Sequence, residues 1–260
     1  MDARLRARDG RWSGVVAGSA VEEITDRIAL QIASGRLKPG DTLPSIRKLA
    51  EEHGVSPSRI QQVIGRLQYA GFVEARHGAG VIVRDIRLYG GVETWRYLFR
   101  LSSNLPELTV RNVKEILETL QLFYQAALMK LAEDPSAFDP APARRAVNQL
   151  QLLAGTGPAR AADVHHSVLH ILRTIHASLG GGIILGLLNT MGGTLADVPD
   201  VLEPLYSDPA EHLLFWDQVV TAMETGDVEL GRQTLALLED WHAQVLDRLR
   251  TRLTTPSVGP

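Results

Sequence analysis

Between residues 56 and 66 the chain gathers side chains that can donate hydrogen bonds, and the stretch contains no acidic residue. The polar residues of this stretch are Ser56, Ser58, Arg59, Gln61, Gln62 and Arg66. Arg and Gln each present polar atoms in a geometry that matches the edges of bases in the DNA major groove, and hydroxyls suit either bases or phosphates. The chemistry indicated is therefore recognition of nucleic acid and not bond breaking.

The apolar residues of the same stretch recur with helical spacing, which predicts a helix from Ser56 to Gly71 with Pro57 in its first turn. Its buried face would carry Ile60, Val63, Ile64 and Leu67. The polar donors then lie on the opposite face. A shorter helix, with Pro44 in its first turn and Gly54 as its stop, precedes it. Two short helices joined by a tight glycine turn are typical of a helix-turn-helix.

A hairpin is predicted directly after these helices. "FVEAR" and "VIVR" alternate as strands, and "HGAG" joins them with His77 and Gly78 at the tip. Glycine lets a backbone approach a groove wall closely. With a first helix over Ser19–Leu37, the elements form a winged helix-turn-helix. A small packing module without a nucleic-acid role is the alternative.

Composition places limits on the rest of the chain. The 260 residues include no Cys, which excludes disulfides and Cys-based zinc sites. No apolar run is long enough for a membrane span, and the N-terminus lacks the apolar core of a signal peptide. We therefore expect a cytoplasmic protein.

The charge is distributed unevenly. Residues 36–87 hold nine Lys or Arg and five Asp or Glu, a net charge of +4, whereas residues 1–35 hold five of each sign. Because the whole chain carries −3, residues 88–260 carry −7. Only the N-terminal module is expected to meet a polyanion.

Beyond about Glu93 the periodicity is helical and strand signals almost vanish. The sequence predicts a mainly α protein: a winged helix-turn-helix followed by an all-α bundle of six or seven helices. The expected divisions are a flexible arm (1–18), the winged helix-turn-helix (19–87), a helical effector-binding and dimerisation domain (88–253) and a flexible tail (254–260).

Two motifs of the N-terminal module resemble the DNA-binding domain of GntR-family bacterial transcription regulators. They are "GxLxPGDxLPSxRxLAExxGVS" over residues 35–56 and "LxxxGFVEARHGxGVxV" over residues 67–83. The resemblance implies operator contacts from Arg47, Ser56, Ser58, Arg59, His77 and Gly78. Pro57 stands where the family has Arg, Ser or Thr, and Gln61 matches a frequent Arg. Because Gln prefers adenine and Arg prefers guanine, we expect an operator that differs from the one common in the family.

The helical segment resembles the FadR-like branch of that family, through "SLGGGIILGLLNTM" (178–191) and "WDQVVTAMETGD" (216–227). Many members of that branch hold a metal with one Asp and three His, and the matching positions here are Val168, Leu172, Trp216 and Leu238. These side chains cannot ligate a divalent ion. The family's carboxylate-binding Arg corresponds to Leu120 or Gln121. No metal or other cofactor is therefore expected.

The resemblance then implies an apolar pocket for a fatty acyl-CoA or another hydrophobic effector. Its expected lining is Leu120, Tyr124, Val168, Leu172, Trp216 and Leu238. Two alternatives remain open. The pocket could be filled by these side chains as ordinary core, or a metal could lie one turn away, at His212 and His242 with a third ligand from the helix that carries His165, His166, His170 and His176.

Together these features predict a ligand-responsive, sequence-specific DNA-binding transcription regulator. One recognition helix reads few bases, so a homodimer on an inverted repeat is expected. A metal-dependent or small-carboxylate-responsive regulator and a constitutive DNA-binding dimer are the alternatives. An enzyme is not expected, because no nucleophile motif, phosphate loop or convergent carboxylate pair is present, and "GGG" at 180–182 follows no strand.

Overall fold

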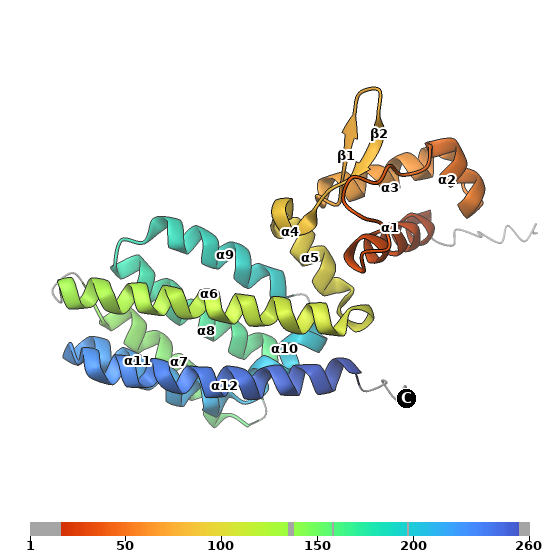
Figure 1. Cartoon of the computed structure of the whole chain (residues 1–260). Coiled ribbons are helices and arrows are strands. Elements are labelled where there is room, and N and C mark those ends of the chain that lie inside the picture. Colours follow the sequence, from red (N-terminus) through yellow and green to blue (C-terminus); the bar gives the residue numbers. More distant parts are fainter. Residues whose placement is uncertain (1–16, 135–137, 158, 197, 255–260) are drawn as a thin grey trace, which may run out of the picture. The chain divides into compact units, whose positions relative to one another are not determined.

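The computed structural model describes residues 17–134, 138–157, 159–196 and 198–254, and the chain divides into two compact units, Met1–Tyr89 and Gly90–Pro260 (Figure 1). The domain boundary expected after residue 87 lies two residues before this division. The predicted flexible arm and tail lie outside the described residues, apart from residues 17–18 and 254, which are helical.

The first unit contains a helix-turn-helix and a two-stranded wing. Its elements are α1 (Ala17–Ala33), α2 (Ile46–His53), α3 (Pro57–Tyr69), β1 (Val73–Arg76), β2 (Gly80–Val83) and α4 (Ile86–Tyr89). The predicted apolar face of α3 is buried, and α1 packs against it through its own buried face, Val21, Ile24, Ile28 and Ile32. This confirms the winged helix-turn-helix.

The turn between α2 and α3 depends on local backbone chemistry. Ser45 is the N-cap of α2, and its hydroxyl accepts a hydrogen bond from the Lys48 amide at 3.3 Å. Placing Pro44 in the first turn was therefore wrong, because Pro44 precedes the cap. Gly54 ends the helix with φ of 63°, in the left-handed region that favours glycine.

The wing is an antiparallel hairpin in which Val73 pairs with Val83 and Arg76 with Gly80. Its second strand is also held from the other side, since the Leu43 amide donates to the Val81 carbonyl at 2.8 Å. The segment before α2 thereby fixes the base of the wing. The tip is free to extend from the unit, as Figure 1 shows for the loop between β1 and β2.

The second unit is an all-α bundle, as predicted, but its described residues form eight α-helices where six or seven were expected. It contains α5 (Val92–Arg100), a 3₁₀ turn (Ser102–Asn104), α6 (Pro106–Glu133), α7 (Ala141–Gly155), α8 (Ala161–Ser178), α9 (Gly182–Ala196), α10 (Pro199–Tyr206), α11 (Pro209–Thr225) and α12 (Val228–Thr254). The two short helices α5 and α10 were not predicted. Each spans fewer than ten residues, and α10 contains Pro204, so their periodic signal is weak.

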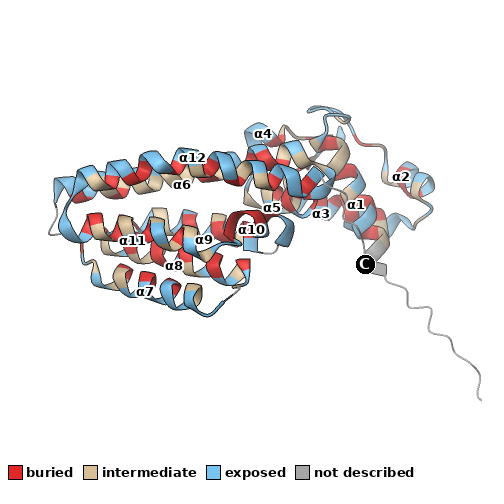
Figure 2. Cartoon of the chain, turned by 90° about the horizontal axis from the view of Figure 1, so that it is seen from below, coloured by how far each residue is buried: buried red, intermediate tan, exposed pale blue. Residues whose placement is uncertain are grey.

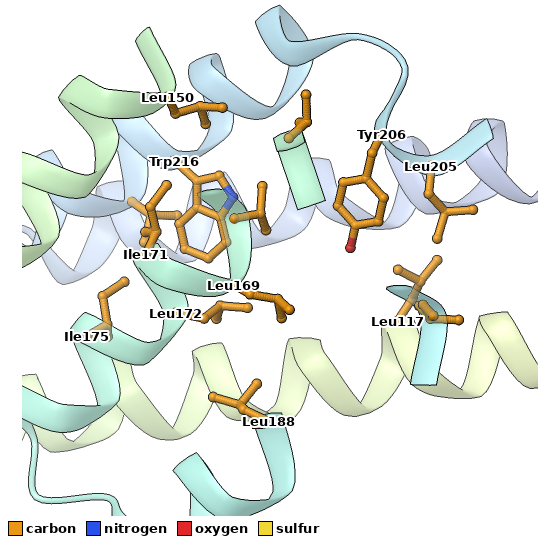
Figure 3. Packing of buried hydrophobic residues seen from close by; sticks show 14 of the residues in the cluster. Leu117, Leu150, Leu169, Ile171, Leu172, Ile175, Leu188, Leu205, Tyr206 and Trp216 are labelled. Atoms are coloured by element: carbon orange, nitrogen blue, oxygen red, sulfur yellow. The ribbon is translucent and has the colours of Figure 1, made fainter. Parts of the chain in front are cut away.

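The long helices α6 and α12 lie side by side, and buried residues follow their inner faces while the outer faces are exposed (Figure 2). Helix α8 packs against α7, α9 and α10. Its side chains Ile171, Leu172 and Ile175 belong to the same buried cluster as Trp216 (Figure 3). Trp216 is only 1% exposed, and burying such a side chain stabilises the fold by roughly 2–3 kcal/mol. None of the described helices is long and apolar enough to cross a membrane.

A polar connection joins α7 to α11. The Arg144 guanidinium donates to both carboxylate oxygens of Glu224, at 2.9 and 2.6 Å, and to the Thr221 hydroxyl at 2.9 Å. It also bonds to Asp217. These partners raise the pKa of Arg144 well above its ordinary value, chiefly through the hydrogen bonds to Glu224. The cluster fixes the position of the helix that carries Trp216.

Candidate nucleic-acid interface and interior pocket

The polar face of α3 is open to solvent. Ser56, Ser58, Gln61, Gln62 and Arg66 are exposed, and Arg59 is half-buried. The Ser56 and Ser58 hydroxyl oxygens lie 3.0 Å apart at the start of the helix, and the Ser56 side chain makes no capping hydrogen bond. These groups therefore point outward as a set, from a helix whose other face is firmly buried.

Arg47 extends from α2 with 91% of its side chain exposed. Its nearest acidic partner is Glu51, at 3.9 Å between Nε and Oε1. An exposed ion pair at that distance contributes little, so the guanidinium remains available to a phosphate. The structure thus brings Arg47 to the surface of the same helix-turn-helix as the α3 donors.

The wing tip combines an imidazole side chain with a left-handed backbone. His77 and Gly78 are exposed, and Gly78 has φ of 76°. The neighbouring Arg76 bonds through Nε to Glu74 at 2.5 Å and is also exposed. Arg76 was not among the predicted site residues, and it lies at the end of the strand directly before His77.

A cavity of about 230 Å³ lies in the second unit, between α6, α8, α10, α11 and α12, and the exposed side chains of Leu214 and Leu237 are part of its lining. Five of the six residues expected around an effector line it: Leu120, Tyr124, Val168, Trp216 and Leu238. Leu172 does not line the cavity and is buried in the core. The cavity shows that these side chains do not fill the whole interior.

One end of the cavity is lined by aromatic and imidazole rings. Tyr206 stacks on His212 with ring centroids 4.9 Å apart, and Trp241 meets His212 edge-on at 5.1 Å. His165 contacts the Tyr206 ring from α8 at 4.8 Å. Figure 3 shows Tyr206 pointing from α10 into the interior, with its hydroxyl at the inner end. Sequence analysis missed Tyr206 and Trp241, which the tertiary fold brings together from different helices.

Burial keeps these rings uncharged. It lowers the pKa of His165 and of His242 to about 4, and it also lowers the pKa of His212. Burial raises the pKa of Tyr206 above its ordinary value. At neutral pH the ring-lined end therefore offers neutral donors and acceptors.

The acidic residue of the pocket already has partners. Glu211 accepts hydrogen bonds from the Trp241 indole at 3.0 Å and from Arg248 at 2.9 and 3.3 Å. Burial by itself raises the pKa of Glu211, but the bonds from Arg248 and Trp241 outweigh it and lower that pKa overall. Glu211 is therefore a carboxylate that holds α11 against α12.

The histidines do not form a metal site in the described part of the chain. No group of three His, Cys, Asp or Glu side chains there is arranged to hold an ion. The Nε2 of His212 is hydrogen bonded to the Leu205 carbonyl at 2.9 Å, which engages one of its two ring nitrogens within the bundle. This geometry gives the relocated metal site no support.

Comparison with known families supports the assignment of the first unit. The family described as "Bacterial regulatory proteins, gntR family" matches residues 20–83. These residues include α2, α3 and the whole wing.

Residues 20–83 form a GntR-family helix-turn-helix domain.

Curated relatives extend the similarity beyond this GntR-family domain. The HTH-type transcriptional regulator Mce2R of Mycobacterium tuberculosis is 40% identical over 105 residues, which cover 40% of this chain and 42% of that protein. The Fatty acid metabolism regulator protein of Pasteurella multocida is 26% identical over 132 residues, or 51% of this chain and 52% of that protein. The chain thus spans about half the length of these relatives or less. Both matches are too long to end within the first unit, so they reach the helical one.

A solved structure supports the fold. The structure described as "Lar controls the expression of the Listeria monocytogenes agr system and mediates virulence" matches with a TM-score of 0.52 at 16% identity. It covers 88% of this chain and 95% of that chain. At this identity the likeness concerns the fold alone. The relatives named above are regulators, and neither is described as an enzyme.

Proposed function

We propose that the chain is a sequence-specific DNA-binding transcription regulator, and not an enzyme, that responds to a hydrophobic effector. The observation that carries the DNA-binding part is the exposed donor face of α3 within a GntR-family domain. A helix fits the dimensions of the major groove, and the exposed Gln, Arg and Ser side chains of α3 can form hydrogen bonds with base edges there.

The contacts divide into two kinds. Gln61 and Gln62 lie in the middle of α3, where side chains reach base edges, and a Gln amide pairs best with adenine. Arg47, Arg66, His77 and Gly78 flank that position on α2, on α3 and on the wing and would contact phosphates or groove walls. The Ser56 and Ser58 hydroxyls and the half-buried Arg59 would bind DNA phosphates and so position the N-terminus of α3 on the DNA backbone.

The chain would act as a homodimer on an inverted repeat. One α3 covers only a few base pairs, and two related by a two-fold axis give the length that a specific operator requires. The effector would change DNA affinity by binding one arrangement of the two winged domains more tightly than another.

The effector would lie in the cavity lined by Leu120, Tyr124, Val168, Trp216 and Leu238. Each methylene group transferred there from water contributes about 0.8 kcal/mol, so an aliphatic chain binds without a metal or a cofactor. The acyl group of a fatty acyl-CoA is such a chain. The similarity to a protein named as a fatty acid metabolism regulator supports this choice.

Two measurements test the proposal. Operator DNA selected from a random pool by the purified protein should form an inverted repeat, and binding without sequence preference would contradict the DNA-binding part. Native mass spectrometry of the purified protein, followed by lipid analysis after denaturation, should reveal a co-purifying acyl chain or acyl-CoA. A bound metal in place of lipid would contradict the effector part.

A further inference from the structure

The cavity in the second unit has polar groups but lacks a cation. Among the described residues that line it, none is Lys or Arg. Its only charged lining side chain is Glu211, which is anionic. The other residues of the lining with polar side-chain atoms are Tyr124, Tyr206, His212, Trp216, Gln218, Thr234, Trp241 and His242. All of these are neutral hydrogen-bonding groups.

The cation bonded to Glu211 already has a carboxylate partner. Arg248 gives its two terminal nitrogens to Glu211, at 3.3 and 2.9 Å, and it does not line the cavity. An anionic ligand that sought Arg248 would have to displace the Glu211 carboxylate. It would also break the bond from the Trp241 indole to Glu211, or leave that carboxylate beside its own charge.

The imidazoles do not replace the missing cation. His212 is 4% exposed, and it is packed between Tyr206 and Trp241 with Nε2 on the Leu205 carbonyl. His242 is 9% exposed, and burial holds its pKa near 4. A carboxylate placed beside these rings would therefore have neutral neighbours and one anion, an arrangement that proteins avoid.

The size of the cavity limits the ligand further. A dry protein cavity of about 150 Å³ is known to hold benzene. A cavity of about 230 Å³ then accommodates a molecule with roughly ten non-hydrogen atoms. The pocket is too small for the phosphates and nucleotide of CoA, which would remain outside it.

We propose that this pocket selects an uncharged lipophile with about ten carbon atoms and an alcohol, ketone or ester end, and disfavours the carboxylate with the same carbon chain. This inference rests on the proposed effector function. An acyl thioester satisfies it only through its uncharged acyl end.

The test compares 1-decanol with sodium decanoate on the full-length protein by isothermal titration calorimetry at pH 7.5, below micelle-forming concentrations. Decanol is expected to bind at least about tenfold more tightly than decanoate, because the carboxylate lacks a buried partner. The variant Leu120→Arg adds a cation from α6 at a half-buried position that can keep its charge near solvent. It should reverse the order of the two ligands, whereas the control Leu120→Met should keep it.

Each outcome has one meaning. Equal or tighter binding of decanoate by the wild-type protein overturns the choice of an uncharged ligand and leaves an apolar effector pocket in place. Binding of neither ligand overturns the effector pocket and this inference with it. If Leu120→Arg fails to fold, the wild-type comparison alone decides.

Discussion

The donor face of α3 and the ring-lined end of the cavity both present polar side chains from helices, but they differ in what those side chains already bind. Gln61 and Gln62 are exposed on α3. In the cavity, His212 is bonded to the Leu205 carbonyl, and Glu211 is bonded to Trp241 and Arg248. The surface groups are thus available to a partner, whereas the interior groups also hold the bundle together.

This difference predicts where substitutions act. A change on the α3 face should alter DNA binding and leave stability almost unchanged, because surface substitutions usually shift it by less than about 0.5 kcal/mol. A change in the cavity should alter stability first. Substitutions in the second unit are therefore expected to change stability more than substitutions on α2 and α3.

Trp216→Ala should lower the free energy of unfolding by about 3–5 kcal/mol, because it removes a fully buried indole from the core of the second unit. Urea unfolding followed by circular dichroism measures the change. Leu152→Ala is the control, since Leu152 is 71% exposed and its loss should cost little. Equal stability of the two variants would break the comparison.

Stability should fall as the pH drops from about 6.5 toward 4. His165, His176 and His242 are buried, and burial lowers the pKa of each to about 4, so the unfolded chain binds more protons than the folded one within this range. The neutral histidines contribute fully to the free energy of unfolding above pH 6.5. By pH 5, up to about 2 kcal/mol of that free energy is lost for each histidine. Urea unfolding at pH 7.5 and 5 measures it.

His165→Phe should weaken this pH dependence, because it removes one of the buried imidazoles. The same change at His170, which is exposed on the same helix, should leave the pH dependence as it is. An unchanged pH dependence in both variants would show that the buried rings do not carry it.

Gln61→Ala and Gln62→Ala should relax base preference by about 1–3 kcal/mol at single operator positions, because each removes a two-atom contact with a base edge. Fluorescence anisotropy with a panel of operator variants measures this, and Gln68→Ala near the end of α3 is the control. Thermal stability should not change. A uniform loss of affinity for all sequences would assign these residues to the phosphates instead.

Arg47→Ala should weaken binding to all sequences alike, by about tenfold, and should reduce the salt dependence by about one phosphate contact. Arg27→Ala is the control, because it removes the same kind of basic side chain from α1, which lies outside the helix-turn-helix. Titrations at several salt concentrations separate the two. A loss confined to one operator variant would place Arg47 among the base contacts.

Sequence reasoning recovered the first unit almost completely, because its signals are local. Gly54 adopts the left-handed conformation that the turn requires, and Gly78 does the same at the wing tip. The periodicity of Ile60, Val63 and Leu67 separates the buried from the exposed face of α3 without knowledge of any other helix. Pro44 was predicted in the first turn of α2 but precedes its N-cap, Ser45. Helix ends are usually uncertain by one or two residues.

The second unit was only partly predictable. The family resemblance indicated the positions around the cavity, and five of the six line it, but Leu172 turns to the core instead. Helical periodicity identifies the buried face of a helix and not the neighbour that this face meets. Whether a buried Leu lines a cavity or fills the core is decided by the packing of α6, α8, α11 and α12 around it.

By itself, the sequence determined the two-part organisation, the donor face of α3 and the apolar character of the helical segment, because each depends on spacing along one chain segment. Only the tertiary structure decided that Tyr206, His212 and Trp241 meet at one end of a cavity that lacks a cation in its described lining. These rings come from α10, α11 and α12, and their meeting depends on how three helices pack, for which no single segment carries the information.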